Sequence, residues 1–448
     1  MFVVQSSRGS EKLIARYVSV RAKFWLACFG SVSWLLISVY LSLPWLSDLS
    51  DVLGPYLALY VIGFVAVIPG FMNAFIVLSL LLDARPIRKS IAEFPPVTVL
   101  VPAYNEEQSI RETVQSLLDQ VYPGTLLIKV INDGSSDGTA AEVESMLCLS
   151  NDLELINLPV NVGKSEALND ALSMCETELV MTVDADCWIL KDGVRHLVQR
   201  LLSDPPNTQA VAGSILIRNS RVNWITQAQE WDYFLGIAAI KRIQSLFQGT
   251  LVAQGAFSLY RKPALDAVGG WPKTVGEDIV LSWRLLSAGY RIGHAEDACA
   301  FTMCPTTLRQ FVKQRQRWSR GLIEAFKDSP RLILKRRFST LFIVWNALFP
   351  LMDLAYTLAF IPGIILACFG IFWIVGPMTL ALIPPSILLN QVMYRTIIHT
   401  FEREHLLVRR NRFGFFIYIL VYGIILQPAN VYGYLSEVFS VRKTWGTK

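Results

Sequence analysis

Three short acidic clusters and one Arg/Trp motif lie in a single polar stretch of this 448-residue chain. In order they are Asn132-Asp133-Gly134, Asp184-Ala185-Asp186, Gly276-Glu277-Asp278 and Gln314-Arg-Gln-Arg317-Trp318. Carboxylates can hold a divalent metal or take a proton, whereas Arg and Trp can bind a phosphate and a flat sugar face. The residue types predict a site for a metal, a phosphate and a hydroxyl-bearing acceptor.

Asp184 and Asp186 follow the apolar segment 179–183, which predicts a buried strand. Two carboxylates one residue apart at a strand end can bind Mg²⁺ or Mn²⁺, with a diphosphate completing the coordination shell. An isolated Asp-X-Asp is common in loops and would be weak on its own. The preceding strand and the other clusters favour the metal interpretation, with Asp186 as the main ligand.

Glu277 and Asp278 open the helical stretch 279–286. An acceptor hydroxyl is a poor nucleophile until a base takes its proton, and a positioned carboxylate contributes about 10²- to 10⁴-fold. We favour Asp278 as this base, with Glu277 as the second choice, and count Glu277 as a candidate for contacting the acceptor. The alternative is that both residues only favour a helix N-terminus.

Four residues are candidates for binding the nucleotide donor. Tyr104 and Asp133 can contact a base, and Glu106 stands close to Tyr104 in the same cluster. Lys164 precedes a predicted helix and can pair with a diphosphate at its N-terminus. The alternatives are a helix N-terminus for Glu106, a turn at Asp133 and a solvated Lys164.

The motif around Arg317 is the most specific of these features. Arg317 can hold a leaving diphosphate with its planar fork, while Trp318 offers a flat face on which an acceptor sugar can stack. A basic helix with one Trp could equally anchor the protein at a membrane surface. The position downstream of the acidic clusters favours the active-site interpretation.

The elements that must position these residues alternate between strands and helices. Strands are predicted at 97–101, 127–131, 153–158 and 179–183, with helices at 106–118, 139–147 and 165–174. This order predicts an α/β domain with a mostly parallel sheet. Because ligands bind beyond the carboxyl ends of such strands, the clusters should converge on one edge. Two further segments, 224–246 and 308–326, are predicted as amphipathic helices that lie on the membrane or pack on the sheet.

Membrane-length apolar segments flank the polar stretch. The chain is 53% hydrophobic and only 17% charged, and segments 24–47, 52–82, 354–394 and 413–436 carry no charge. We divide the chain into a cytosolic N-terminus (1–23), two transmembrane helices (24–83), a cytosolic catalytic domain with interfacial helices (84–338), an interfacial segment with two transmembrane helices (339–396), a cytosolic basic loop (397–412), a transmembrane or re-entrant segment broken at Gln427-Pro428 (413–438) and a C-terminal tail (439–448).

Basic residues around the first hairpin set its orientation. Lys and Arg stand before residue 24 and after residue 82, whereas the short loop between the helices has only Asp48 and Asp51. The polar stretch should therefore face the cytoplasm of a multi-pass protein in the inner or plasma membrane. The net charge of +5 arises from these flanks, so nucleic acid is not an expected partner. The seven cysteines form no Cys-X-X-Cys pair, which argues against a zinc site or a disulfide framework.

Together the motifs resemble the processive family-2 glycosyltransferases, which include poly-β-1,6-N-acetylglucosamine, hyaluronan, chitin and cellulose synthases. The resemblance covers residues 95–326, and the flanking segments in outline. It implies a GT-A fold, a UDP-sugar donor, Mg²⁺ or Mn²⁺, and inversion at the anomeric carbon. It assigns Tyr104 and Asp133 to uridine, Lys164 to the donor, Asp184 and Asp186 to donor and metal, Asp278 to the base, and Gln314, Arg317 and Trp318 to the acceptor and the channel mouth.

The C-terminal residues Trp445-Gly446-Thr447-Lys448 resemble the Trp-Gly-Thr-Arg ending of hyaluronan-type synthases. The resemblance implies a cytosolic gating segment over the donor, although Lys stands here in place of Arg. A path for the polymer between membrane helices needs a polar lining, for which Asn346, Asp353 and Asn390 are candidates. Hydrogen bonds between helices are the alternative role for these three residues.

The expected function is processive transfer of a sugar from a UDP donor, with UDP-N-acetylglucosamine the best choice, to a growing polysaccharide that crosses the lipid bilayer. Poly-β-1,6-N-acetylglucosamine is the favoured product, and hyaluronan, chitin or another β-glycan is the alternative. A single-sugar transferase acting on a lipid acceptor is a second alternative, and a non-catalytic scaffold or transporter is a third. An accessory membrane subunit is counted as a candidate partner.

Overall fold

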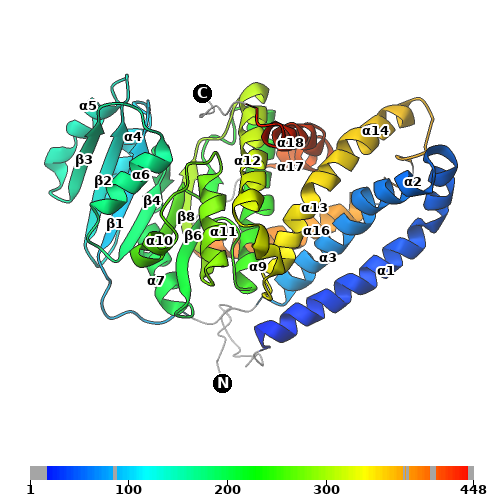
Figure 1. The fold of residues 1–448 in the computed structure, drawn as a ribbon, viewed down its shortest axis with the longest axis horizontal. Coiled ribbons are helices and arrows are strands. Elements are labelled where there is room, and N and C mark those ends of the chain that lie inside the picture. The colour runs from blue at the N-terminus through cyan, green and yellow to red at the C-terminus, as the bar shows by residue number, and fades with distance from the viewer. Residues whose placement is uncertain (1–17, 84–87, 377–378, 380–382, 404–409, 442–448) are drawn as a thin grey trace.

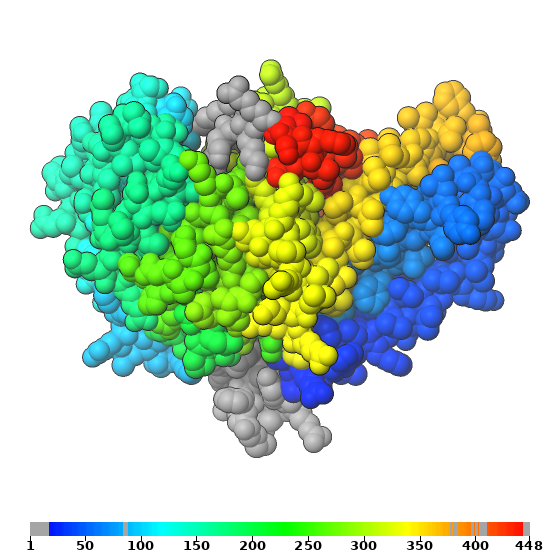
Figure 2. Space-filling view, in the orientation of Figure 1, coloured from blue at the N-terminus to red at the C-terminus, as the bar shows by residue number. Residues whose placement is uncertain are grey.

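The computed structural model describes residues 18–83, 88–376, 379, 383–403 and 410–441. An α/β domain lies beside a set of long helices that come from both ends of the chain (Figure 1). Helices of the C-terminal half lie between the α/β domain and the N-terminal helices (Figure 2). The chain therefore places a soluble type of domain and an apolar bundle side by side, as the charge pattern predicts.

The core of the α/β domain is an eight-stranded sheet with the order β3-β2-β1-β4-β7-β6-β8-β5. The strands are β1 (Val97–Ala103), β2 (Leu126–Asp133), β3 (Leu153–Leu158), β4 (Leu179–Val183), β5 (Trp188–Ile189), β6 (Thr208–Ile217), β7 (Phe257–Arg261) and β8 (Arg291–Thr302). Strands β1 to β4 pair in parallel, as do β6 and β8, whereas β7 runs antiparallel to β4 and β6. The predicted mostly parallel sheet is confirmed.

Helices cover both faces of this sheet. They are α4 (Ile110–Leu118), α5 (Thr139–Glu144), α6 (Lys164–Ser173), α7 (Gly193–Ser203), α10 (Lys262–Ala267) and α11 (Glu277–Ser287). Side chains alternate along β1: Val99 and Val101 face the apolar core shared with α4 and α7, while Leu100 faces the core shared with α6 and α11. The near-continuous apolar strands are thus explained by burial on both faces.

Three described helices are long and apolar enough to cross a membrane. They are α1 (Val20–Leu53); the continuous helix Pro55–Leu81, made of α2 (Pro55–Ile62), a π-helical turn and α3 (Ile68–Leu81); and the continuous helix Thr340–Cys368, made of α13 (Thr340–Ala355), a π-helical turn and α14 (Ile361–Cys368). Helix α16 (Ile383–Arg403) is not among these candidates. A second crossing within 339–396 stays a prediction.

The last apolar run is bent, but not where the sequence predicted. Helices α17 (Arg412–Leu420) and α18 (Tyr422–Val438) meet at Val421 at an angle of 50°. Pro428 lies inside α18, so the predicted break at Gln427-Pro428 is wrong. Proline removes one backbone hydrogen bond, but here it does not end the helix. Whether the bent pair crosses the bilayer stays a prediction.

The two amphipathic segments lie between the sheet and the apolar bundle (Figure 1). The first consists of α8 (Trp224–Trp231), a π-helical segment η3 (Asp232–Ala239) and α9 (Ile240–Leu246); the second is α12 (Leu308–Asp328). Leu235 and Ile243 share one apolar core with Leu216 of the sheet and Phe342 of α13. These helices therefore pack on the sheet and the bundle at the same time.

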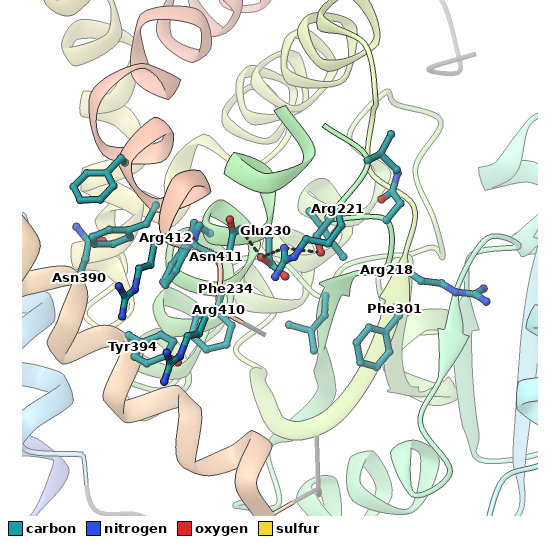
Figure 3. A pocket seen from close by; sticks show the side chains of 18 of the residues that line it. Arg218, Arg221, Glu230, Phe234, Phe301, Asn390, Tyr394, Arg410, Asn411 and Arg412 are labelled. Atoms are coloured by element: carbon teal, nitrogen blue, oxygen red, sulfur yellow. Dashed lines mark hydrogen bonds and ion pairs between the residues drawn. The ribbon is translucent and has the colours of Figure 1, made fainter. Parts of the chain in front are cut away.

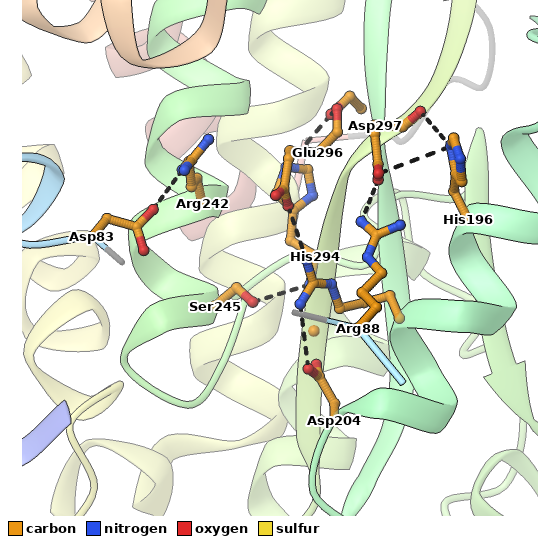
Figure 4. A network of polar contacts seen from close by, with 12 residues as sticks. Asp83, Arg88, His196, Asp204, Arg242, Ser245, His294, Glu296 and Asp297 are labelled. Atoms are coloured by element: carbon orange, nitrogen blue, oxygen red, sulfur yellow. Dashed lines mark hydrogen bonds and ion pairs between the residues drawn. The ribbon is translucent and has the colours of Figure 1, made fainter. Parts of the chain in front are cut away.

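Ion pairs fix the junction between the bundle and the domain (Figure 4). The buried carboxylate of Asp83, just after α3, pairs with Arg242 of α9 at 2.5 Å. Arg88 pairs with Asp297 of β8, whose carbonyl contacts the Nδ1 atom of His196 at 3.0 Å. The two sides of the short segment 84–87 are thus attached to adjacent parts of the domain.

Candidate active site

The predicted donor residues lie at one edge of the sheet. Tyr104, Asp133 and Asp184 stand at or just after the carboxyl ends of β1, β2 and β4, which are neighbours in the parallel part of the sheet. The side chain of Tyr104 is 49% exposed, so its ring is open to a ligand. The edge thus has the position where α/β sheets bind ligands.

Asp133 is buried and shapes the loop that carries Lys164. Its two carboxylate oxygens accept hydrogen bonds from the backbone amides of Val162 (2.7 Å) and Gly163 (2.9 Å). Gly134 has φ 64°, and a Cβ there would lie 2.6 Å from the backbone of Val160 and Asn161, so only glycine fits. The strand end and the loop before α6 are therefore fixed together, while contact of Asp133 with uridine stays a prediction.

Lys164 joins two of the acidic clusters. Its Nζ atom lies 2.5 Å from Asp184 Oδ1 and 3.2 Å from Glu277 Oε1. Burial opposes the charged form of Lys164, but the carboxylates of Asp184 and Glu277 outweigh burial and raise the pKa. Burial likewise raises the pKa of Glu277, against the effect of Lys164 and Arg317. Residues 164, 184 and 277 are far apart in the chain and meet at one ammonium group.

Two glycines allow α11 and α12 to cross closely. A Cβ on Gly276 would lie 2.5 Å from the Cα of Gly321, so any side chain would collide with backbone. The amide of Gly276 also donates to Glu324 at 2.9 Å. This crossing brings the start of α11, with Glu277 and Asp278, against the part of α12 that carries Arg317.

Asp186 lies where several negative charges gather. Burial and the charges of Asp184 and Glu106 raise the pKa of Asp186 to about 6, while Thr302 donates to its Oδ2 at 3.2 Å. The described residues contain no group of three His, Cys, Asp or Glu side chains that could hold a metal ion by themselves. The arrangement fits a cation that takes its remaining ligands from a substrate and water, as Mg²⁺ usually does.

The Arg/Trp motif faces this centre from α12. The Oε1 atom of Gln314 is buried and has no hydrogen-bond partner in the described structure, so a ligand can satisfy it. Trp318 is 38% exposed, and its ring centroid lies 6.1 Å from that of Tyr233. These features fit the predicted acceptor roles of Gln314 and Trp318, which stay predictions.

A support for Trp318 was missed by the sequence reasoning. Arg315 lies under Trp318, with its guanidinium carbon 4.2 Å from the ring centroid. Asp232 of η3 forms an ion pair with Arg315 at 2.8 Å and accepts a hydrogen bond from the Tyr422 hydroxyl of α18 at 2.9 Å. Asp232 lies in the amphipathic segment 224–246 and Tyr422 in the last apolar run, and nothing in the spacing connects them to Arg315. Only the folded chain joins the four residues.

Lys241 of α9 is a second residue that the sequence reasoning missed. Its ammonium group is buried and forms no hydrogen bond within the described residues. Burial lowers the pKa of Lys241 to about 7, and the charge of Asp278 opposes this shift. The one feature of the sequence that could have indicated this residue is the Lys-Arg pair at 241–242 within the amphipathic segment 224–246.

Helix α18 is attached to α12, the helix that carries the candidate acceptor residues. Glu437 accepts from Lys327 at 2.8 Å and pairs with Arg320 at 3.4 Å, both on α12. A Cβ on Gly433 would lie 1.9 Å from the hydroxyl of Ser319, so the two helices touch at this glycine. The part of α12 beyond Trp318 is therefore held by a helix of the apolar bundle.

The candidates for a polymer path make local or helix-to-helix contacts. Asn346 and Asn390 each donate to a carbonyl of their own helix, at 2.7 and 2.8 Å. Asp353 of α13 accepts from Asn430 (3.1 Å) and Tyr434 (2.9 Å) of α18. The alternative role in helix packing thus accounts for Asp353, and a path stays a prediction. The possible gating residues Trp445, Gly446 and Thr447 lie outside the described residues.

The fold is that of a GT-A glycosyltransferase. It is similar to a mannosyltransferase from Pyrobaculum calidifontis, solved in complex with GDP-Man and Mn²⁺, with a TM-score of 0.59 and 19% identity. The match covers 89% of this chain and 100% of that one.

Residues 98–269 match Glycosyl transferase family 2, so the chain contains a family-2 glycosyltransferase domain. It is 31% identical over 274 residues to a poly-beta-1,6-N-acetyl-D-glucosamine synthase of Staphylococcus epidermidis, covering 59% of this chain and 66% of that one. A synthase of the same name from Staphylococcus aureus is 34% identical over 233 residues, covering 52% of this chain and 56% of that one. The chain thus spans less than two thirds of the length of these relatives.

Proposed function

We propose that this protein is an inverting glycosyltransferase that adds sugars from a UDP donor, best UDP-N-acetylglucosamine, to a growing polysaccharide. Poly-β-1,6-N-acetylglucosamine is the favoured product, in line with the names of the relatives. The observation that carries the proposal is Lys164, which bridges Asp184 at 2.5 Å and Glu277 at 3.2 Å. This contact unites the strand-end carboxylates with the candidate base cluster in one site.

The donor would bind at the sheet edge, with its base beside Tyr104 and Asp133 and its diphosphate near Asp184, Asp186 and Lys164. Asp186 and Asp184 would hold Mg²⁺ or Mn²⁺, which would neutralise charge on the diphosphate. Lys164 and Arg317 would stabilise the negative charge that develops on the departing UDP. Glu106 adds a further carboxylate next to Asp186.

Asp278 would take the proton from the acceptor hydroxyl as that oxygen attacks the anomeric carbon. The new glycosidic bond forms on the face opposite UDP, the bond from the anomeric carbon to the diphosphate oxygen breaks, and UDP leaves with the electron pair. A single displacement inverts the anomeric centre, so no covalent enzyme intermediate is needed. Trp318, with Gln314 and Glu277 nearby, would hold the acceptor sugar in position.

We further propose that the catalytic domain lies on the cytoplasmic side of the inner or plasma membrane. The basic flanks of α1 and α3 support this orientation. The bundle beside Trp318 would then receive the product, and an accessory subunit could complete the passage. The orientation is tested by labelling Cys148, which is exposed in the domain, in intact spheroplasts with a membrane-permeant and a membrane-impermeant thiol reagent. Labelling of Cys148 should require the membrane-permeant reagent.

The activity is tested with purified full-length protein, a panel of UDP-sugars and either Mg²⁺ or Mn²⁺. We expect UDP release with one donor, loss of release in chelator, and a polymer that is cleaved by a hydrolase specific for its linkage. Products limited to one added sugar would instead indicate a transferase acting on a lipid acceptor. Absence of UDP release with every donor would contradict the proposal.

A further inference from the structure

A large cavity lies apart from the catalytic carboxylates, between α8, α16 and the start of α17 (Figure 3). Its volume is about 970 Å³. The aromatic part of its lining consists of Trp231, Phe234, Phe301, Tyr394, Phe415 and Phe416. The proposed sugar transfer assigns no role to this space.

Positive charge dominates the polar part of the lining. The lining residues include four arginines (Arg218, Arg221, Arg410 and Arg412) and one carboxylate, that of Glu230. Arg221 is paired with Glu230 at 2.6 Å, and Arg218 is paired with Glu112. Arg410 and Arg412 are exposed and have no ion-pair partner among the described residues. The cavity therefore keeps two guanidinium groups for an anion.

The start of α17 adds to this positive field. Asn411 caps the helix by accepting from the amide of Gly414 at 3.0 Å, and its own carbonyl accepts from Trp231 Nε1 at 2.8 Å. The side-chain amide of Asn411 donates to Glu230 and to the carbonyl of Gln227, so the wall is held rigidly. Arg410 and Arg412 thus stand at the positive end of a helix whose position is fixed, which favours an anionic group.

The cavity lies on the other face of the amphipathic helix from the acceptor residues. Trp231 and Phe234, three residues apart, face the cavity, whereas Asp232 and Tyr233 face Arg315 and Trp318. A polymer of N-acetylglucosamine carries no charge and does not require unpaired guanidinium groups. The charge and the placement both favour an anionic ligand over the growing chain.

The surroundings favour a lipid over a soluble anion. Five of the six aromatic side chains of the lining come from the helical elements α8, η3, α16 and α17, and Phe301 comes from β8. Helix α17 begins an apolar helix pair of membrane-spanning composition. An aromatic wall beside guanidinium groups suits a molecule with a phosphate and an apolar tail. We propose that this cavity binds the phosphate-bearing headgroup of an anionic membrane lipid, with Arg410 and Arg412 at the phosphate.

The test uses full-length protein in nanodiscs made of phosphatidylcholine with increasing amounts of phosphatidylglycerol. Lipids retained by the protein are measured by native mass spectrometry, and the thermal midpoint is measured in parallel. The variant Arg410→Gln/Arg412→Gln is compared with Arg309→Gln/Arg331→Gln, which removes the same charge at exposed arginines of other segments. Arg410→Lys/Arg412→Lys keeps the charge but not the planar fork.

We expect the native protein to retain phosphatidylglycerol and the Arg410/Arg412 glutamine variant to lose at least tenfold in affinity. The control pair should bind like the native protein, and the lysine pair should be intermediate. Equal retention by the glutamine variant and the native protein would overturn the proposal. Full competition by inorganic phosphate or glycerol phosphate would identify a soluble anion as the ligand, and protection of the cavity by N-acetylglucosamine oligomers would identify the polymer path. None of these readouts depends on sugar transfer, so they stand apart from the test of the proposed function.

Discussion

The donor side and the acceptor side of the site are built in different ways. The donor residues stand at the ends of β1, β2 and β4, and backbone contacts such as those of Asp133 set their positions. Trp318, the proposed acceptor residue, instead stacks on Arg315 of α12, which is held by Asp232 of η3 and Tyr422 of α18. Local sheet geometry fixes the donor side, whereas the acceptor side depends on long-range contacts with the helical bundle.

This difference predicts that damage to the two sides has different kinetic signatures. Donor-side changes should alter donor affinity and turnover together. Acceptor-side changes should leave donor binding intact and alter acceptor KM and product length. The donor side and the acceptor side meet at three residues, Lys164, Glu277 and Asp278.

The largest effect on activity is expected for a substitution where the donor side and the acceptor side meet. Asp278→Asn should lower kcat by about 10²- to 10⁴-fold because an amide cannot take the acceptor proton. UDP binding, measured by calorimetry, should stay unchanged, since Asp278 is proposed to act on the acceptor hydroxyl and is not among the proposed donor-binding residues. Near-normal turnover would remove Asp278 as the base.

The second-largest effect on activity is expected for Lys164→Met. It leaves the carboxylates of Asp184 and Glu277 facing each other without a cation, and it removes a charge from the leaving diphosphate. We expect kcat/KM for the donor to fall by about 10²- to 10³-fold. Lys273→Met is the control, because Lys273 pairs with Glu166 at the surface and should be replaceable.

Arg315→Lys should affect only the acceptor side. Lysine keeps the charge near Asp232 but cannot stack flat on the indole, so Trp318 loses part of its support. A loss of about 1 kcal/mol at this contact raises the acceptor KM by roughly fivefold and shortens the product. Arg309→Lys on the same helix should change neither. A change in donor KM of equal size would show that the two sides are not separable.

The smallest effect concerns pH and Lys241. The pKa of Lys241 is lowered to about 7 in the folded protein, so the unfolded chain binds its proton more tightly. Between pH 7 and the ordinary lysine pKa of about 10.4, stability therefore rises with pH, and below pH 7 the full cost of the buried charge remains. Lys241→Met should remove this dependence. Thermal midpoints from pH 6 to 9 should then differ most between variant and native protein at pH 6.

Much of the donor half could be predicted from the sequence. The strands at 153–158 and 179–183 were predicted with the bounds that the structure has, because both are short segments rich in apolar residues and bounded by turns. Strands β6, β7 and β8 were not predicted. Their pairing is partly antiparallel and joins segments far apart in the chain, so no local pattern marks their partners.

The acceptor half shows why the rest was out of reach. Arg315 stood inside a recognised motif, yet its partners are Asp232 and Tyr422, 83 and 107 positions away. The bend of the last run was placed at Pro428 because proline is a strong helix breaker, but the break occurs at Val421. Helix α18, which contains Pro428, packs on α12 through Gly433 and Glu437, and a single sequence does not contain that information.

The ion pairs of Glu437 with Arg320 and Lys327 join α18 to α12, so that the two helices move together. A helix adapts to a bilayer of a different thickness by changing its tilt. If α18 crosses the bilayer as proposed, such a tilt would also turn α12 and the indole of Trp318, the proposed platform for the acceptor sugar. We expect the length of the product to vary with the acyl-chain length of the host lipid, and Glu437→Gln to weaken that dependence.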